Sequence, residues 1–321
     1  MNSERWVDQT VLVTGGAGFI GSHLVEQLVA AGATVTILDD FSSGSRENLA
    51  TVYDKVRLQE LDIRQIAWDQ VLTDQPYDVI FHLAANAYVP PSVECPDWDY
   101  QINLESTLRL LEALRKAKWP GKLIYASSAA VYGNPARMPI HEGDPTVPIS
   151  PYGVSKLAAE RYVAVYSQLY NLKATSLRLF PVYGPRQRKQ VVYDLIRKIF
   201  QNPSELFIYG DGTQTRDFSY VEDVARAAML VAERAPLQGE VYNVASGREC
   251  SIRELAEKLC HIIGASPKFV YSGSVRPGDP ERWSVDISRL TALGYRPQIL
   301  LEQGLRRTVE WFQATHKKGS R

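Results

Sequence analysis

The chain contains few cysteines and no excess of charge of either sign. Its 321 residues include three cysteines, Cys95, Cys250 and Cys260, which lie far apart and form neither a CxxC pair nor a metal-ligand spacing. Free thiols in a reducing compartment are the simplest interpretation, so we predict a cytoplasmic protein with no metal site. Lys plus Arg and Asp plus Glu number 36 each. Surfaces for nucleic acids or membranes need a basic excess, so we expect neither partner.

Long apolar runs are also missing. No segment approaches the length of a membrane-spanning helix, and the polar residues 1–9 lack the apolar core of a signal peptide. Hydrophobic residues make up 45% of the chain and charged residues 22%, which is the balance of a globular protein. A chain of this length folds as one large domain or as two closely joined domains.

The first half of the sequence alternates short β-rich runs with longer helical patterns, which is typical of a parallel sheet. The predicted strands are residues 10–14, 34–38, 56–61, 79–83, 122–126 and 174–178. Hydrophobic periodicity predicts helices at residues 20–31, 103–116 and 151–170. We therefore predict an α/β fold built on a doubly wound parallel sheet.

Beyond Phe180 the elements become shorter, and Pro and Gly become more frequent. Helical patterns recur at residues 192–200, 221–234 and 251–263. We predict a first domain over residues 1–180 and a smaller α/β domain over residues 181–321. We also expect some of the later segments to return and pack on the first sheet.

A glycine run lies between the first predicted strand and the first predicted helix. Gly15, Gly18 and Gly21 form the pattern G-x-x-G-x-x-G. In the dinucleotide-binding fingerprint, one glycine permits a tight turn, another lets the backbone approach the pyrophosphate, and the third allows close helix packing. Amide groups at the helix start face the phosphate charge. Glycine also serves ordinary turns, so it is the strand before the run and the helix after it that favour a dinucleotide site.

Aspartates follow the next two predicted strands. Asp39 ends the second strand, eighteen residues after Gly21. A carboxylate there accepts hydrogen bonds from the adenosine ribose and repels a 2′-phosphate, which favours NAD over NADP. The alternative is an N-cap or loop role, and that role suits the neighbouring Asp40 better. Asp62, after the third strand, is a candidate for contact with the adenine edge, with an ordinary turn Asp as the alternative.

Tyr152 and Lys156 are four residues apart at the start of a predicted helix, so both side chains lie on one face. An ammonium near a phenol lowers the pKa of the Tyr toward the working pH, and a bound cationic nicotinamide adds to this effect. Ser128 ends the preceding strand, where its hydroxyl can hydrogen-bond the reacting oxygen, and Ser127 is the second choice. An exposed Tyr with a solvated Lys is the alternative. The glycine run and the serines, however, precede the pair in the right order.

Taken together, these motifs resemble the extended short-chain dehydrogenase/reductase family. The segments that carry the resemblance are Gly15 to Gly21, Asp39, His82-Leu83-Ala84-Ala85, Asn103, Ser128, Val131-Tyr132-Gly133 and Tyr152-Gly153-Val154-Ser155-Lys156. Within the family the chain is similar, over essentially its whole length, to NAD-dependent nucleotide-sugar epimerases such as UDP-glucose 4-epimerase.

The resemblance implies a Rossmann domain that holds NAD, a second domain that holds a UDP-sugar, and a homodimer paired through helices such as 103–116 and 151–170. The catalytic residues that it implies are Ser128, Tyr152 and Lys156. The residues that it assigns to the cofactor are Gly15, Gly18, Phe19, Ile20, Gly21, Asp39, Asp40, Ser43, Gly44, Asp62, Ile63, Leu83, Ala84, Ala85, Asn103, Tyr152 and Lys156.

A second set of residues is assigned by the resemblance to the substrate. These residues are Ser128, Tyr152, Arg216, Arg276, Asp279 and Trp283. In the resembling enzymes the two arginines bind the diphosphate, a task that suits a bidentate guanidinium, and Asp279 would contact the nucleotide ribose. Without the resemblance, each Arg would more often be a surface salt-bridge partner.

The reaction that the resemblance implies is 4-epimerisation. Tyr152 takes the proton of the 4-hydroxyl while hydride passes from C4 to NAD; the 4-keto sugar then turns over, and hydride returns to its other face. Related dehydratases carry Asp-Glu directly after the Ser/Thr position, and decarboxylases keep a Glu at the second of these places. Here Ala129 and Ala130 occupy them, and alanine cannot move a proton. We therefore expect 4-epimerisation of a UDP-hexose, UDP-glucose or UDP-galactose.

Two positions bear on the sugar. Trp283 falls where these enzymes gate the 2-substituent; a bulky residue there excludes an N-acetyl group, and a buried core Trp is the alternative. Pro181 stands where the epimerases usually carry an Asn that contacts the nucleotide sugar. We expect that contact to come from elsewhere, with Arg186 or Gln190 as candidates.

Three alternatives stay open at this point. The first is a UDP-glucuronate 4-epimerase or decarboxylase, because Arg186, Arg188 and Lys189 are unassigned cations that suit a carboxylate at C6. The second is another nucleotide-sugar oxidoreductase, such as a keto-sugar reductase. The third is a non-catalytic NAD-binding regulator, which is disfavoured because such a protein has no need of the Ser, Tyr and Lys together.

Overall fold

The computed structural model describes residues 5–273 and 282–317 of the chain. Its centre is a seven-stranded sheet in the order β11-β6-β5-β4-β1-β2-β3, and every neighbouring pair in it is parallel. The strands of this sheet are β1 (Thr10–Thr14), β2 (Thr34–Asp39), β3 (Val56–Glu60), β4 (Val79–His82), β5 (Lys122–Ser128), β6 (Lys173–Leu179) and β11 (Gln238–Val244). A parallel sheet of this kind needs cover on both faces.

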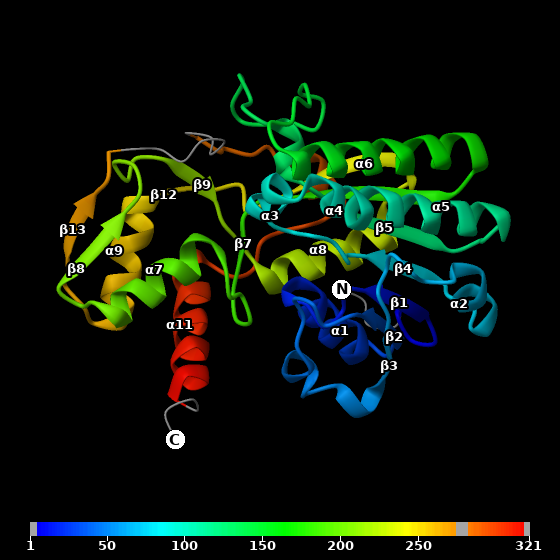
Figure 1. Cartoon of the computed structure of the whole chain (residues 1–321), viewed down its shortest axis with the longest axis horizontal. Coiled ribbons are helices and arrows are strands. Elements are labelled where there is room, and N and C mark those ends of the chain that lie inside the picture. Colours follow the sequence, from blue (N-terminus) through cyan, green and yellow to red (C-terminus); the bar gives the residue numbers. More distant parts are fainter. Residues whose placement is uncertain (1–4, 274–281, 318–321) are drawn as a thin grey trace.

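Helices provide that cover (Figure 1). On one face α1 packs against α8, and on the other face α5 packs against α6. The helices of this part are α1 (Phe19–Ala30), α2 (Trp68–Asp74), α3 (Val89–Glu94), α4 (Pro96–Tyr100), α5 (Ser106–Lys116), α6 (Pro151–Tyr170), α8 (Val221–Arg234) and α10 (Ser288–Ala292). Among the described residues, no helix is both long and apolar enough to cross a bilayer.

A smaller lobe lies beside the sheet (Figure 1). Its helices are α7 (Gln190–Gln201), α9 (Ile252–Ile263) and α11 (Leu301–Lys317). Its strands form three short pairs, β7 (Val182–Tyr183) with β10 (Ser219–Tyr220), β8 (Glu205–Ile208) with β13 (Lys268–Tyr271), and β9 (Thr215–Asp217) with β12 (Glu249–Ser251). The three helices share an apolar core of their own, which includes Leu195, Leu255 and Leu305. The lobe therefore has a hydrophobic core distinct from those on the two faces of the sheet.

The predicted α/β fold with a doubly wound parallel sheet is confirmed. The chain does not stay in the smaller lobe after residue 180, because α8 packs on α1 and β11 extends the large sheet beside β6. The helix predicted at 103–116 starts earlier. It follows α4 through a π-helical turn at Gln101–Glu105, and such turns often occur at functional sites.

The strands bring several polar residues to one edge of the sheet. The register pairs Thr14 of β1 with His82 of β4, and Ser128 of β5 with Leu179 of β6. Helix α6 starts near the same edge, where the Ser150 hydroxyl accepts a hydrogen bond from the Gly153 amide at 3.1 Å and caps the helix. The carboxyl edge of the sheet is where open α/β folds bind ligands.

A buried ion pair fastens α6 to the sheet below this edge. Glu160 of α6 and Arg178 of β6 are each 1% exposed, and their closest charged atoms are 2.6 Å apart. The Ser127 hydroxyl donates to Glu160 at 2.7 Å. Arg178 also donates to the Tyr132 hydroxyl at 2.7 Å, and that hydroxyl donates to Asn243 of β11 at 2.6 Å. The network therefore joins β5, α6, β6 and β11.

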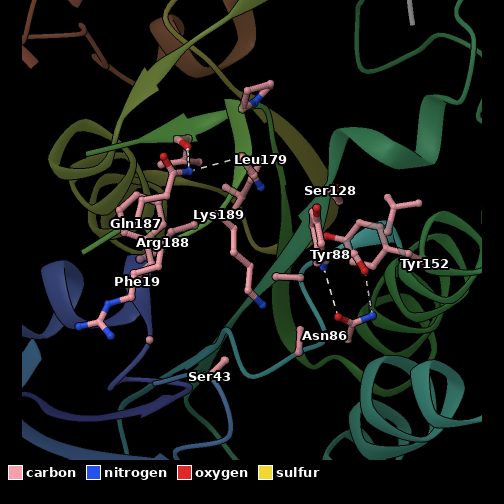
Figure 2. Close-up of a pocket in the computed structure, with 18 of the residues that line it drawn as sticks. Phe19, Ser43, Asn86, Tyr88, Ser128, Tyr152, Leu179, Gln187, Arg188 and Lys189 are labelled. Atoms are coloured by element: carbon pink, nitrogen blue, oxygen red, sulfur yellow. Dashed lines mark hydrogen bonds between the residues drawn. The ribbon is translucent and has the colours of Figure 1, made fainter. Parts of the chain in front are cut away.

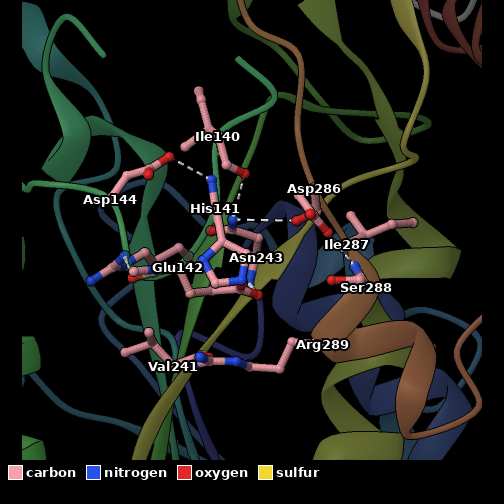
Figure 3. Close-up of polar contacts among 12 residues, drawn as sticks. Ile140, His141, Glu142, Asp144, Val241, Asn243, Asp286, Ile287, Ser288 and Arg289 are labelled. Carbon is pink, nitrogen blue, oxygen red and sulfur yellow. Dashed lines mark hydrogen bonds and ion pairs between the residues drawn. The ribbon is translucent and has the colours of Figure 1, made fainter. Parts of the chain in front are cut away.

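Asn243 also fixes the loop that follows β5 (Figure 3). Its side-chain amide donates to the Ile140 carbonyl at 3.1 Å, and its backbone amide donates to the buried Glu142 carboxylate at 2.9 Å. The Ile140 carbonyl accepts a second bond from the Asp286 amide at 2.9 Å. These contacts hold the 282–287 segment, which carries Trp283, against the sheet.

The buried pair yields a stability prediction. Glu160→Gln leaves the Arg178 guanidinium buried beside a neutral partner, so the free energy of unfolding should fall by about 3–5 kcal/mol. Glu60→Gln is the matched control, because Glu60 pairs with Arg46 at the surface, and its effect should stay within about 0.5 kcal/mol. Urea denaturation measures both variants. A loss of less than about 1 kcal/mol in Glu160→Gln would show that the pair does not hold α6 in place.

Candidate active site

A cavity of about 1080 Å³ opens at the carboxyl edge of the sheet. Its volume lies at the top of the range for a single drug-sized ligand, so it has room for two ligands side by side. One side is formed by the turn after β1 and by Ser128 and Tyr152, and the other side by lobe residues such as Tyr209 and Arg216. Figure 2 shows Ser128, Tyr152, Tyr88 and Lys189 gathered around this space.

The glycine run forms the floor of the cavity. Gly15 has φ +70°, and a Cβ atom there would lie 2.8 Å from the backbone nitrogen of Ala84. A Cβ on Gly21 would lie 2.1 Å from the Gly15 carbonyl oxygen. Both positions therefore require glycine, because no flexible side chain can yield. Gly18 precedes α1 directly and lines the cavity. Together these features form the cradle that a dinucleotide pyrophosphate needs.

Asp39 lies at the end of β2 on the cavity wall. Its carboxylate accepts hydrogen bonds from the amides of Ala17 and Phe41, both at 2.9 Å. Burial raises the pKa of this carboxyl above its ordinary value, against the effect of these amides. A Cβ on Gly44 would lie 2.8 Å from Asp39 Oδ1, so the loop approaches the carboxylate closely. Asp39 is thus fixed in one orientation at the place predicted for the ribose contact.

All but one of the other predicted cofactor residues line the cavity. Those that line the cavity are Phe19, Ile20, Asp40, Ser43, Gly44, Asp62, Ile63, Leu83, Ala84 and Ala85. Two of their carboxylates already have partners. Asp40 accepts from Ser42 within its own turn, and Asp62 forms an ion pair with Arg64, whose hydrogen bonds lower the pKa of Asp62.

Asn103 does not line the cavity, unlike the other predicted cofactor residues. It is almost fully buried behind the wall. Its amide nitrogen donates to Asp99 at 2.8 Å and to the Asn86 carbonyl at 3.2 Å. The π-helical turn that carries Asn103 directs the side chain toward these groups. Asn103 therefore supports the wall from behind.

The three predicted catalytic residues lie together on the cavity wall. Tyr152 and Lys156 are on the first turns of α6, and Ser128 ends β5. Ser128 lines the cavity, and its hydroxyl accepts a hydrogen bond from the Ala130 amide at 3.2 Å, whereas the Ser127 hydroxyl donates to buried Glu160 at 2.7 Å. The geometry therefore favours Ser128 over Ser127 as the residue that meets the reacting oxygen.

Burial has the largest effect on the pKa values of both Tyr152 and Lys156. Burial raises the pKa of Tyr152 to about 12, with the Ser128 hydrogen bond acting in the opposite direction. Lys156 is 3% exposed, and burial lowers its own pKa to about 7. Its ammonium donates to the Ala126 carbonyl at 2.9 Å. The lowering of the Tyr152 pKa by Lys156 and a bound nicotinamide stays a prediction, because burial is the largest influence on both groups here.

The predicted substrate residues are only partly described. Arg216 and Trp283 both line the cavity, with the guanidinium 5.8 Å from the Trp283 ring centre. Trp283 packs edge-on against Phe180 at 5.3 Å between ring centres. Arg276 and Asp279 lie outside the described residues. Arg216 is therefore the charged residue that the described part of the chain places in the cavity among those predicted to bind the substrate.

The cations at 186–189 behave differently from one another. Arg186 lines the cavity and forms a 2.6 Å ion pair with Glu26 of α1, which fixes its loop to α1. Gln190 also lines the cavity, and the predicted contact of either residue in place of an Asn at position 181 stays a prediction. Arg188 is exposed and lies 3.7 Å from Glu47. Lys189 points into the cavity, 5.5 Å from the centre of the Tyr88 ring (Figure 2). No local sequence pattern indicates the Tyr88–Lys189 contact, because the two residues lie about a hundred positions apart.

The chain matches a known family and several relatives. The profile of the "NAD dependent epimerase/dehydratase family" matches residues 11–245. A "Putative UDP-glucose 4-epimerase" of Methanocaldococcus jannaschii is 38% identical over 96% of this chain and 99% of the relative. The structure of the Thermotoga maritima UDP-glucose 4-epimerase with UDP-glucose has a TM-score of 0.89 and 36% identity, covering 96% of this chain and 100% of that one. The Bacillus cereus UDP-glucuronic acid 4-epimerase, solved with UDP-glucuronic acid and NAD, has a TM-score of 0.87 and 32% identity, covering 96% and 100%.

The Asp39 geometry yields a prediction on cofactor choice. Asp39→Asn removes the charge that repels a 2′-phosphate and one acceptor for the ribose, so NAD should bind about tenfold more weakly and its preference over NADP should shrink. Fluorescence titration of the stripped protein with each dinucleotide measures this. Asp54→Asn is the control, since Asp54 is exposed and outside the cavity. Unchanged affinities for both dinucleotides in Asp39→Asn would contradict the assignment.

Proposed function

The chain belongs to the NAD dependent epimerase/dehydratase family, and within this family we propose that it interconverts UDP-glucose and UDP-galactose by inverting C4 of the hexose. The observation that carries the proposal is the cavity wall around Ser128, Tyr152 and Lys156. Directly beyond Ser128 this wall continues with Ala129 and Ala130. Neither side chain can donate or accept the protons that elimination of water or loss of a carboxylate requires. The wall thus supports a reaction confined to oxidation and re-reduction at one carbon.

The chain's own residues have separate tasks in this reaction. When bound, NAD supplies the hydride acceptor and donor and brings a positive charge into the cavity. The Ser128 hydroxyl orients the sugar 4-hydroxyl, and Tyr152 removes its proton and later returns it. Burial holds the pKa of the free phenol at about 12, so a positive charge in the cavity is needed before Tyr152 can act as a base near neutral pH. Lys156 contributes such a charge while it remains protonated.

Several features support a hexose with a free 2-hydroxyl. Trp283 lines the cavity beside Phe180, and a bulky side chain at the place where the resembling enzymes gate the 2-substituent would exclude an N-acetyl group at C2. Arg216, on the same side of the cavity, provides a guanidinium for the diphosphate. Pro181 also lines the cavity and has no side-chain donor, and Arg186 and Gln190, which line the same cavity, are the candidates for the contact that an Asn makes in the resembling enzymes.

A second candidate is 4-epimerisation of UDP-glucuronate. It is favoured by Lys189, whose ammonium points into the cavity near Tyr88, and by the likeness to the Bacillus cereus enzyme. A carboxylate at C6 would be matched by this cation.

A panel of nucleotide sugars tests both candidates. Without added NADH, UDP-glucose should give UDP-galactose, read by proton NMR at C4, with much slower turnover of UDP-N-acetylglucosamine. Tyr152→Phe should lower kcat by about 10²–10⁴-fold because it removes the general base, whereas Tyr53→Phe, at an exposed tyrosine, should not. A 4-epimer formed from UDP-glucuronate alone would select the second candidate. Net NADH formation, or no 4-epimer from any sugar, would refute both.

We further propose a homodimer that pairs through α5 and α6 in the cytoplasm. The outer face of α6 exposes Val154, Tyr162, Val165 and Leu169 at helical spacing, and such a stripe marks an interface. The free thiols of Cys95, Cys250 and Cys260 suit a reducing compartment.

The proposed interface predicts a change in mass. Leu169→Glu places a charge at a side chain that is 67% exposed in the single chain, so the variant should sediment as a monomer where the unmodified protein sediments as a dimer. Leu300→Glu, at an equally apolar exposed site of the smaller lobe, should remain a dimer. A monomeric unmodified protein at micromolar concentration, or a dimeric Leu169→Glu, would contradict the proposal.

A further inference from the structure

A buried carboxylate lies behind the wall that carries Tyr152. Asp99 is 0% exposed and accepts three hydrogen bonds, from Asn86 at 2.7 Å, from Asn103 at 2.8 Å and from Ser155 at 2.6 Å. All three donors are neutral groups. A buried carboxylate is normally paired with a cation in direct contact. The hydrogen-bond donors to Asp99 are neutral, so its charge is not cancelled by them and can act on other groups of the site.

The three donors belong to three different parts of the site. Asn86 follows β4 and lines the cavity, Asn103 lies in the π-helical turn, and Ser155 lies on α6 between the two catalytic residues. The Ser155 hydroxyl is also 3.0 Å from the Tyr152 carbonyl oxygen. Asp99 therefore ties the first turn of α6 to the loop after β4.

The charge of Asp99 acts on both catalytic residues. It raises the pKa of Lys156, against the larger lowering by burial, and it adds to the burial that raises the pKa of Tyr152. Both effects have the sign expected of a nearby anion, which favours an ammonium and disfavours a phenolate.

Other titratable groups pack around Lys156, and they do not supply this charge. His82 of β4 is neutral, because burial and Lys156 lower its pKa to about 3. The Tyr125 ring of β5 lies 5.0 Å from the ammonium, and burial raises the pKa of Tyr125, so it is neutral as well. Glu160, one turn further along α6, is already paired with Arg178.

We propose that Asp99 is a positioning residue for the Tyr152–Lys156 pair, which holds the first turn of α6 through its hydrogen bonds and keeps Lys156 an ammonium through its negative charge. The proposal rests on the functions proposed above for Tyr152 and Lys156. Its consequence is that a larger fraction of Lys156 stays protonated near neutral pH than burial alone would allow, and this fraction carries the positive charge that the phenol needs.

Asp99→Asn tests the charge with little change in hydrogen bonding. The Asn oxygen can take the place of Oδ1 and accept from Asn86 and Asn103, while its NH₂ group faces the Ser155 oxygen. Ser155 can then direct its own hydrogen to the Tyr152 carbonyl, which it already contacts. Asp97→Asn is the matched control: it makes the same change on the same helix, but at an exposed residue that bonds only Gln101 among the described contacts.

The readout is the pH dependence of kcat for the holoenzyme. Loss of the negative charge lowers the pKa of both Tyr152 and Lys156, so both limbs of the profile should move to lower pH. At a pH just above the alkaline limb of the unmodified enzyme, kcat should fall roughly tenfold, with KM nearly unchanged. Asp97→Asn should superimpose on the unmodified profile. If the pH values at which kcat rises and falls are the same in Asp99→Asn as in the unmodified enzyme, the proposal is overturned, even if kcat is lower at every pH.

A second measurement separates this proposal from the proposed reaction. The phenolate of Tyr152 is titrated by ultraviolet difference absorbance of the holoenzyme, with Tyr152→Phe as the blank, in the presence and absence of the Asp99→Asn change. A lower midpoint in the variant supports the proposal even if no sugar turns over, and an unchanged midpoint overturns it. If Asp99→Asn does not fold, as judged by circular dichroism, Asp99→Ser makes the same loss of charge and is scored in the same way.

Discussion

Strands β1, β4, β5 and β6 lie side by side and run parallel, so their carboxyl ends meet at one edge of the sheet. The glycine turn follows β1, Asp39 ends the neighbouring β2, and Ser128 ends β5. These groups are far apart in the sequence, yet the register places them around one cavity. Helix α6 then brings Tyr152 and Lys156 to the same edge. A shift in strand register would separate the cradle of the cofactor from the groups that act on the substrate.

Two buried carboxylates near this edge, Glu160 and Asp99, differ in the groups that contact them. Glu160 and Arg178 neutralise each other and fasten α6 to β6. Asp99 has only neutral donors in contact, and its field reaches Lys156 and Tyr152. The first arrangement serves stability, because each charge satisfies the other. The second leaves a net negative charge near two titratable groups, which is the situation in which a protein adjusts proton affinities for catalysis.

Much of this arrangement could be predicted from local patterns. Gly15, Gly18 and Gly21 were recognisable because a strand and a helix flank them, and Ser128 followed from the end of a buried strand. The sequence could not predict the pKa of Tyr152, because the result depends on how deeply α6 buries the phenol. Nor could it indicate Asp99, whose partners come from three separate segments. The same holds for Arg186, which looked free for a ligand but is bound to Glu26 of α1.

In the proposed reaction one carbon of the sugar is oxidised and re-reduced in a cavity where Ala129 and Ala130, directly after Ser128, cannot transfer a proton. UDP-glucose that carries deuterium at C4 tests it most directly. We expect UDP-galactose that retains the deuterium at C4 in full, with none lost to water, because the hydride that leaves C4 is the one that returns to it. Loss of the deuterium to solvent, or its retention without any change of configuration at C4, would contradict the account.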